Sequence, residues 1–371
     1  MIRCLLTDVG IVSALGCGRD ETMRRLAAGE APGMRPIALT GGETSYFGFA
    51  ELPASAFASF PTRVAALLEA AVAQLDLASL FREVDPRRVG IVLGTSNSTM
   101  EEFTDNPDRI DMGYPAEWLR ERCGTGGPAW CVSTACSSSA KVFASARRLL
   151  AEGVCDAVLV GGADAHTRTV VEGFHALESL AGGHTRPLAP DRDGINLGEG
   201  AALLVMVRDD SPLAVGSGIQ LLGVGESSDA YHLTAPDPDG KGAEASMRAA
   251  LADAGLVTVD YVNLHGTGTV YNDAMECAAV RSVFGDAVPC SSTKPLTGHC
   301  LGAAGAIEAA LCWIALKRGK GLPPHCAAPV DVSLAPFPIP QVGDERPLRT
   351  VLSNSFAFGG SNASVILGVG F

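Results

Sequence analysis

The sequence predicts an α/β fold with largely parallel or mixed sheets. Two observations lead to this prediction. Short apolar segments alternate along the chain with longer segments of helical periodicity, and one half of the sequence weakly repeats the other. With 371 residues, of which 47% are hydrophobic and 19% charged, the chain has enough apolar side chains for a large core.

Apolar runs of three to six residues are expected to form buried strands, and the periodic segments between them are expected to form helices. The strands are Val89–Leu93, Ala157–Val160, Ala202–Val207, Tyr261–Leu264 and Val365–Leu367. The helices are Arg63–Leu75, Lys141–Glu152, Ala243–Ala254 and Gly302–Lys317. The second and fourth helices are crowded with Ala, Ser and Gly. Because glycine in a helix interior costs up to about 1 kcal/mol, we expect these two helices to lie between sheets, packed tightly on each other.

The internal repeat predicts two related halves. In each half, a strand that ends in a Gly-Thr turn precedes a strand–turn–helix unit and then a strand with Gly-Gly. The similar segments are Arg88–Thr99 with Tyr261–Asn272, Cys131–Gly153 with Cys290–Gly319, and Ala157–Ala165 with Val351–Leu367. The polar stretch Arg208–Val215 is the candidate seam, so we expect one half to span residues 1–210 and the other residues 211–371.

Composition excludes several classes of protein. Eleven cysteines, an odd number with no CxxC, support neither a disulfide framework nor a zinc site, and they suit reduced thiols in a cytoplasmic protein. The net charge of −13 argues against nucleic acid as a partner, and an acidic carrier would need a local basic patch. No apolar run is long enough for a membrane span, and we see no signal peptide. GxGxxG, the phosphate-loop signature and GxSxG are all missing, so nucleotide binding and an α/β-hydrolase are not supported.

The segment VSTACSSSAK (Val132–Lys141) holds one cysteine among small and hydroxyl-bearing residues. A strand stops and a helix begins near Cys136. A helix N-terminus presents free N–H groups and a partial positive charge, which favour the thiolate and lower a cysteine pKa. The alternative is a buried structural thiol, the common state of a free cysteine. Its place at a helix start makes Cys136 the candidate nucleophile.

Two histidines are candidates for the same site. His265 follows a predicted strand, and His299 starts the second small-residue helix, the place that Cys136 has in the first half. A pseudo-twofold between the halves would bring both helix starts to one cavity, at the edge where the strands end. A neutral histidine there could donate an N–H to a carbonyl, although either could be an ordinary buried polar residue. Glu308 lies in an apolar helix and needs a partner, for which Lys294 is the candidate.

Five blocks together resemble the elongating β-ketoacyl-[acyl-carrier-protein] synthases of the thiolase-like superfamily. In the order of that family they are VSTACSSSA, RPLAPDRDGINLGEGAALLVM, HGTGTVYNDAMECAAV, STKPLTGHCLGAAGAIEA and NSFAFGGSNASVIL. The resemblance runs from the first strand to the last residues. It implies a thiolase-like αβαβα layered architecture with duplicated halves, the first half carrying the nucleophile and the second half the two histidines.

The resemblance also implies roles for individual residues. Cys136 matches the acylated nucleophile, and His265 and His299 match the two histidines that activate the malonyl group. Phe358 matches an aromatic gate, and the backbone N–H groups of Cys136 and Phe358 would form an oxyanion hole. Lys294 is counted with the catalytic residues, and the supporting positions are Glu308, Phe358, Gly359, Asp273, Thr267 and Thr269.

The implied activity is a decarboxylative Claisen condensation of malonyl-ACP with a Cys-bound acyl chain, in fatty acid or polyketide/aryl-polyene-type biosynthesis. No metal or cofactor is expected, since the phosphopantetheine arm of the acyl carrier protein is a substrate group. A homodimer is the default assembly, and a heterodimer with a chain-length-factor-like subunit is the alternative. A second class of function is a non-elongating partner or carrier-binding subunit of a ketosynthase heterodimer.

Three departures from the family pattern bear on the substrate. Lys141 is an unusual charge one turn past Cys136, Ala357 replaces a glycine common before the gate phenylalanine, and the segment Asn97–Pro128 is compact. We expect all three to touch the acyl pocket or the dimer seam. They predict a role outside bulk fatty acid elongation.

Overall fold

The computed structural model describes residues 2–52, 54–101, 110–216 and 218–370. Its strands are β1 (Cys4–Ser13), β2 (Gly16–Cys17), β3 (Met34–Ala38), β4 (Thr44–Gly48), β5 (Val89–Gly94), β6 (Ala129–Val132), β7 (Ala157–Asp164), β8 (Leu197–Gly198), β9 (Gly200–Arg208), β10 (Ile219–Ser228), β11 (Tyr261–Asn263), β12 (Cys290–Ser291), β13 (Thr350–Ala357) and β14 (Ser361–Val369). Its α-helices are α1 (Arg19–Ala28), α2 (Ala54–Ala58), α3 (Arg63–Val72), α4 (Leu77–Glu83), α5 (Tyr114–Cys123), α6 (Ser138–Ala151), α7 (Arg168–Ala176), α8 (Lys241–Ala254), α9 (Val270–Phe284), α10 (Lys294–Thr297) and α11 (Ala304–Arg318). Short 3-10 helices are η1 (Pro86–Arg88), η3 (Pro212–Ala214), η4 (Leu301–Ala303) and η5 (Phe358–Gly360).

The described strands of the main sheet run in the order β12-β11-β13-β14-β10-β1-β9-β7-β5-β6, and the pairing pattern repeats. In the first run, β1, β9 and β7 are antiparallel neighbours, whereas β7, β5 and β6 are parallel. In the second run, β10, β14 and β13 are antiparallel neighbours, whereas β13, β11 and β12 are parallel. The two runs meet where β1 pairs with β10. A smaller sheet, β3-β4-β8, lies apart. This repetition agrees with the expected duplication, and the boundary between residues 210 and 211 stays a prediction.

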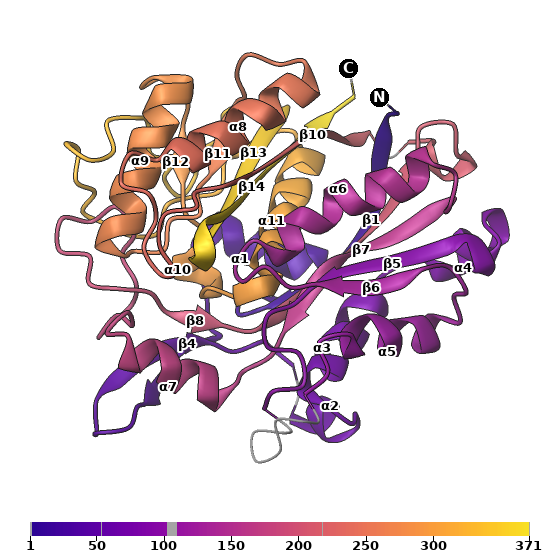
Figure 1. Ribbon diagram of the computed structural model, residues 1–371, viewed down its shortest axis with the longest axis horizontal. Helices are drawn as coiled ribbons and strands as arrows, with labels where there is room; N and C mark the ends of the chain where they lie inside the picture. Colours follow the sequence, from indigo (N-terminus) through magenta and orange to yellow (C-terminus); the bar gives the residue numbers. More distant parts are fainter. Residues whose placement is uncertain (1, 53, 102–109, 217, 371) are drawn as a thin grey trace.

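Helices α6 and α11 form the middle layer, as Figure 1 shows in magenta and orange. Both touch strands of both runs, whereas α3 and α5 cover the first run from outside and α8 covers the second. A Cβ on Gly305 of α11 would lie only 2.7 Å from the backbone nitrogen of Ala140 on α6. The absence of a side chain at this position therefore lets the two helices come close, as the small residues predicted. The layered α/β, thiolase-like fold class is confirmed.

The predicted elements are found with shifted ends. All five predicted strands exist, and β7 and β14 extend beyond the apolar runs that predicted them. The helix predicted from Lys141 begins at Ser138, because the carbonyl of Ser137 already accepts the N–H groups of Ala140 and Lys141. The helix predicted from Gly302 is divided into η4 and α11.

Part of the compact segment Asn97–Pro128, residues 102–109, lies outside the described residues. Two hydrogen bonds join the chain before this stretch to the chain after it. Ser98 Oγ donates to the carbonyl of Asp111 (2.6 Å), and the N–H of Asp111 donates to Thr99 Oγ1 (3.0 Å).

Among the described helices, none alone has the length and apolar character needed to cross a membrane; α3 and α4 meet that test only as a pair bent by 69°.

Candidate active site

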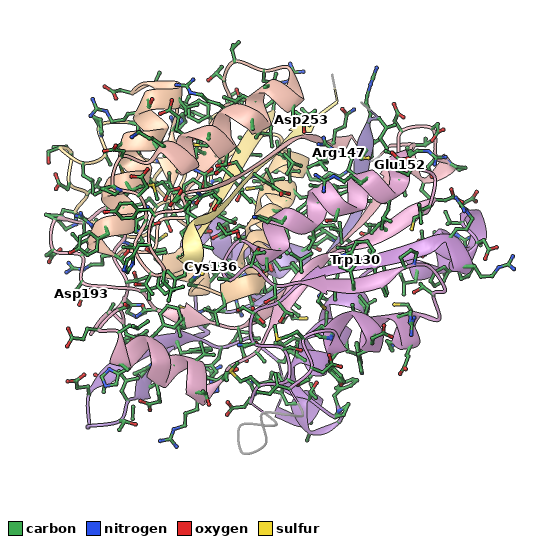
Figure 2. The ribbon with its side chains drawn as sticks, viewed as in Figure 1. Trp130, Cys136, Arg147, Glu152, Asp193 and Asp253 are labelled. Atoms are coloured by element: carbon green, nitrogen blue, oxygen red, sulfur yellow. The ribbon has the colours of Figure 1, made fainter. Side chains whose placement is uncertain are left out.

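Cys136 lies in the turn between β6 and α6, near the middle of the molecule (Figure 2). The preceding residue, Ala135, has a φ of 53°, a left-handed value that is uncommon for a residue with a side chain. The hydroxyl of Ser138 braces this turn, because it accepts the N–H of Thr134 (2.8 Å) and donates to the carbonyl of Ala135 (2.5 Å). The turn therefore holds Cys136 at the mouth of α6, two residues before the helix, as the sequence predicted.

The second half brings both predicted histidines to this thiol. His265 follows β11, and His299 lies between α10 and η4. Cys136 Sγ and one ring nitrogen of each histidine lie within 4.8 Å of one another. The two imidazole rings are edge to face, with centroids 5.2 Å apart. The three residues come from opposite halves of the chain and are all buried.

These three residues line a pocket with a volume of about 130 Å³. Much of the remaining lining is apolar or aromatic, including Phe174, Phe356 and Phe358. The pocket opens to solvent, so a substrate can reach a thiol that is itself almost wholly buried. Concave apolar sites with a few convergent polar groups are typical of ligand binding.

Lys294 and Glu308 form the buried pair that the sequence predicted. Lys294 Nζ donates to Glu308 Oε1 at 2.5 Å, and both side chains are shielded from solvent. The same ammonium lies 3.5 Å from Nδ1 of His265. An ammonium can only donate, so Nδ1 is the acceptor and the imidazole proton is on Nε2. Lys294 thus orients His265 as an N–H donor.

Burial sets the charge state of both imidazoles. It lowers the pKa of His265 and of His299 well below the usual value, and the nearby Lys294 charge lowers both further. Both histidines are therefore neutral at neutral pH, as expected, although burial rather than a helix N-terminus is the main cause. Neither ring nitrogen of His299 has a hydrogen-bond partner among the described residues. A buried imidazole without partners in a pocket is suited to a polar group of a substrate.

The expected lowering of the Cys136 pKa is wrong. Burial raises the pKa of this thiol to about 12, more than Lys294 and the N–H groups of Cys136 and Phe358 lower it. The buried carboxylate of Asp164 raises it further. The sequence located a helix start, which lowers a thiol pKa, but it did not show how deeply the thiol is buried, which raises the pKa. Cys136 is therefore a thiol at rest, and its proton must leave as it reacts.

The cluster also has the residue types of a metal site, since two imidazoles and a thiolate can bind zinc. A histidine that binds a metal usually donates the N–H of its other ring nitrogen to a carboxylate or carbonyl. Here Nδ1 of His265 faces the Lys294 ammonium instead, and His299 has no such acceptor within the described part of the chain. The positive charge of Lys294 beside the cluster would repel a metal cation. This arrangement favours an N–H donor pair over a metal centre.

Phe358 lines the pocket, and Gly359 follows it in the turn between β13 and β14. The Phe358 ring stacks on Phe174 of α7, with centroids 5.8 Å apart and planes at 17°. Gly359 has a φ of 78°, so a side chain at this position would strain the turn. The N–H of Phe358 is close enough to the Cys136 thiol to lower its pKa. This is the placement that an oxyanion hole requires.

Thr267 and Thr269 also line the pocket, and their hydroxyls are 3.0 Å apart. Asp273 lies beneath them and does not reach the pocket; it accepts the N–H groups of Leu188 (2.8 Å) and Gly268 (3.2 Å). Asp273 therefore supports the loop between β11 and α9.

Two buried carboxylates that act on Cys136 and His265, Asp164 and Glu276, are not among the residues predicted from the sequence. Glu276 accepts the N–H groups of His265 (2.8 Å) and Gly266 (2.7 Å), and burial raises its pKa to about 7. Asp164 accepts the hydroxyl of Thr95 and the N–H of Ala303, which joins the first half to η4. The signal for Glu276 was its position one turn after Asp273 on a helix that follows the HGTGT segment, a spacing that places both acids on one face.

A duplicated α/β fold with a buried thiol facing two neutral imidazoles is the architecture of thiolase-like condensing enzymes, which are acyltransferases. Residues 59–211 match the family model "Beta-ketoacyl synthase, N-terminal domain", and residues 219–328 match "Beta-ketoacyl synthase, C-terminal domain". The chain belongs to the β-ketoacyl synthase family.

Relatives of known name support this assignment. The chain is 31% identical to 3-oxoacyl-[acyl-carrier-protein] synthase 2 of Rhizobium meliloti (strain 1021), with 99% of each protein covered. It is 41% identical to nodulation protein E of Rhizobium meliloti over 74% of this chain and 73% of that protein. Among solved structures, a chain of the ketosynthase (ApeO)–chain length factor (ApeC) complex of Xenorhabdus doucetiae superposes with a TM-score of 0.90 at 38% identity, covering 100% of this chain and 98% of that one. The ishigamide ketosynthase/chain length factor superposes with a TM-score of 0.87 at 30% identity over the full length of both chains.

Proposed function

We propose that this β-ketoacyl synthase condenses malonyl-ACP with an acyl chain held on Cys136, releasing carbon dioxide. The observation that carries the proposal is the meeting of the Cys136 thiol with two neutral imidazoles, one of which has both nitrogens unpartnered among the described residues. The phosphopantetheine arm of an acyl carrier protein would bring each substrate. No separate cofactor is needed for this chemistry.

In the first step, Cys136 attacks the thioester of an acyl carrier. A bond forms between Sγ and the acyl carbon, and the bond from that carbon to the pantetheine sulfur breaks. Because burial raises the Cys136 pKa to about 12, the thiol proton leaves during the attack and goes to the departing pantetheine thiolate. The N–H groups of Cys136 and Phe358 would hold the oxyanion.

In the second step, malonyl-carrier occupies the vacated pocket. Its thioester oxygen would accept N–H groups from His265 and His299. Loss of carbon dioxide leaves the electron pair on the α-carbon as an enolate, whose oxygen these two donors stabilise. Neutral imidazoles suit this role because a stronger acid would protonate the enolate.

In the third step, the enolate carbon attacks the acyl–Cys136 carbonyl. The new carbon–carbon bond forms, the oxyanion returns to the N–H pair, and the bond from the carbonyl carbon to Sγ breaks. The Cys136 thiolate then takes up a proton from solvent, because its own proton left with the pantetheine thiol in the first step, and the β-ketoacyl product stays on the carrier arm. Lys294 would act by orienting His265 and not by contact with substrate.

The test of the nucleophile is Cys136→Ala. It should abolish the acyl adduct that intact-mass spectrometry detects after incubation with acyl carriers, while the far-UV circular dichroism spectrum stays native. Removal of one sulfur among small residues should change stability by only about 1 kcal/mol. A Cys136→Ala protein that still accumulates a covalent acyl adduct would overturn the assignment.

A non-elongating partner subunit is the second candidate function. It is favoured only by the similarity to assemblies that contain a ketosynthase and its chain length factor. Cys136 and both histidines argue for an active subunit. Release of carbon dioxide from malonyl-carrier by the purified chain separates the two candidates, since a partner subunit without this activity releases none.

For the pathway, we propose a polyketide or aryl-polyene-type role, in the cytoplasm, with a chain-length-factor-like subunit as the dimer partner. The support is the likeness to the ApeO–ApeC and ishigamide assemblies together with the departures at Lys141 and Ala357. The ε-amino group of Lys141 has neither ion pair nor hydrogen bond to any described residue, so a second subunit could supply an acid. Efficient elongation of long saturated acyl carriers by the lone protein would contradict this role.

A further inference from the structure

His325 does not line the pocket of Cys136, but its buried side chain joins two segments that support the pocket. It lies between α11 and β13 and is 5% exposed. Nε2 lies 3.0 Å from the carbonyl oxygen of Pro187, and because a carbonyl can only accept, Nε2 carries the proton. Nδ1 is then free to accept the N–H of Ser292 (3.3 Å). Both ring nitrogens of this neutral imidazole are therefore engaged.

The Ser292 side of this link leads to the groups around His265. The hydroxyl of Ser292 donates to the carbonyl of Gly266 (2.7 Å) and accepts the N–H of Lys294 (3.2 Å). A Cβ on Gly266 would lie only 2.6 Å from the Cβ of Ser292, so the two residues are in close contact. Gly266 adjoins His265, and the Lys294 ammonium faces Nδ1 of that ring. The position of Ser292 therefore fixes both the loop that carries His265 and the lysine that orients it.

The Pro187 side of the link leads to the segment that supports the other histidine. In this segment Thr185 Oγ1 donates to the carbonyl of Thr267 (3.0 Å). The carbonyl of Asn196 accepts the backbone N–H of His299 (2.8 Å). The segment therefore contacts both the loop after β11 and the backbone of the second imidazole donor.

We propose that His325 is a positioning residue for the decarboxylation step and that it acts on His265 through Ser292. This inference rests on the proposed function, because the imidazole that it positions is one of the two donors assigned to the enolate oxygen. Without its acceptor, the buried N–H of Ser292 would be left unpaired, which favours a shift of that residue. A displacement of about 1 Å at a catalytic group can cost about 10² in rate. The bonds described here do not reach Cys136, so acyl transfer should not depend on them.

Three substitutions separate the two contacts of the ring. His325→Leu removes both. His325→Asn keeps an acceptor near the place of Nδ1, and His325→Gln keeps a donor near the place of Nε2. Each variant is measured for release of labelled carbon dioxide from malonyl-carrier and, by intact mass, for acylation of Cys136.

The expected result is a loss in one activity alone. His325→Leu should lower kcat for decarboxylation roughly 10- to 100-fold, because the donor is displaced while the pocket that binds the substrate is kept. KM for malonyl-carrier and the acylation rate should each stay within about twofold of the native values. A residue that only stabilised the fold would change both activities together or neither.

The Asn and Gln variants test the route through Ser292. His325→Asn should keep decarboxylation within about threefold of the native rate, since the N–H of Ser292 still has an acceptor. His325→Gln should lose nearly as much as His325→Leu. This comparison gives a result even where His325→Leu does not fold. The matched control is His166→Leu, which removes a half-buried imidazole that packs on Phe47 and Phe49 and should leave the ratio of the two activities unchanged.

Three results would overturn the proposal. They are native decarboxylation by His325→Leu, a parallel loss of acylation and decarboxylation in that variant, and equal decarboxylation rates in His325→Asn and His325→Gln. Failure of the native protein to release carbon dioxide from malonyl-carrier would instead overturn the proposed function.

Discussion

The reactivity of Cys136 depends on two opposing effects at a single residue. Withdrawal from solvent disfavours the thiolate, whereas Lys294 and two backbone N–H groups favour it, and burial dominates. The surrounding groups are therefore better placed to stabilise an oxyanion during attack than to hold a resting thiolate. We expect this arrangement to slow oxidation of the thiol between turnovers, since the thiolate is the reactive form.

The two histidines are expected to serve decarboxylation and not acylation. His265→Ala and His299→Ala should each keep acyl transfer to Cys136 but lower malonyl-carrier decarboxylation by roughly 10²–10³, the usual effect of removing one oxyanion donor. Intact mass measures the first activity, and release of labelled carbon dioxide measures the second. A variant that decarboxylates at the native rate would show that its imidazole has another role.

A third buried histidine predicts acid sensitivity of the fold. His325 interacts through Nε2 with the carbonyl of Pro187 (3.0 Å) and accepts the N–H of Ser292 (3.3 Å), and burial lowers its pKa to about 4. The unfolded chain binds a proton at the ordinary histidine pKa near 6.5, so between these values only the unfolded state is protonated. Stability is therefore complete at high pH and falls as pH decreases from about 6.5 to about 4.

We expect His325 to account for about 2 kcal/mol of the unfolding free energy that is lost between pH 8 and pH 5. Urea unfolding of the native protein and of His325→Gln at both pH values measures it. The variant should lose less stability than the native protein on acidification, by about that amount. Equal losses in the two proteins would mean that the ring is protonated in both the folded and unfolded states. The lowered pKa values of His265 and His299 act in the same direction and remain in the variant.

At the scale of elements, the packing of α11 on α6 depends on the missing side chain of Gly305. In Gly305→Ala, the added Cβ would meet the Ala140 nitrogen at 2.7 Å, closer than real contacts allow. We expect a loss of about 1–3 kcal/mol in unfolding free energy from this overpacking, even though alanine is the better helix former.

Gly173 offers the matched control, since it lies inside helix α7 and a Cβ there would meet nothing within 4 Å. Gly173→Ala should raise the unfolding free energy by up to about 1 kcal/mol. Thermal unfolding followed by circular dichroism compares the two variants. A similar gain in both would show that the helices can separate without cost, and that the close approach of α6 and α11 is dispensable.

At the scale of the whole molecule, the two halves share one core. The largest apolar cluster joins residues of both runs of strands with residues of α6 and α11. A nearly buried ion pair adds to this contact: Arg147 of α6 binds Asp253 of α8 at 2.6 Å (Figure 2). Asp253 also accepts the N–H of Val224 in β10. We therefore expect the halves to unfold together.

Arg147→Met tests this coupling. It should lower the unfolding free energy by about 3 kcal/mol, because the buried Asp253 carboxylate is left without its cation, and urea unfolding should still show one transition. The exposed pair Arg281–Asp286 is the control; Arg281→Met should cost less than about 1 kcal/mol. Two resolved transitions in the native protein would mean that the halves are stable independently.

Much of this protein could be predicted from the sequence because local patterns report local structure. Apolar runs and small-residue helices identified the strands and the middle layer, and the repeat anticipated the same pairing pattern in β1–β9 and in β10–β14. The segment around Cys136 located the start of α6 to within a turn. The pairing of Lys294 with Glu308 followed from the need of a buried carboxylate for a cation.

Other properties were decided only by the tertiary structure, since they depend on residues far apart in the chain. The distance from Cys136 to the histidines is set by the packing of the two halves. The raised pKa of the thiol depends on its depth below the surface, which no helix signal encodes. The contact of the Glu276 carboxylate with the N–H of His265 depends on how α9 packs beside β11. Local sequence specifies periodicity and turns, whereas burial and Coulomb interactions arise only when distant segments exclude water from one another.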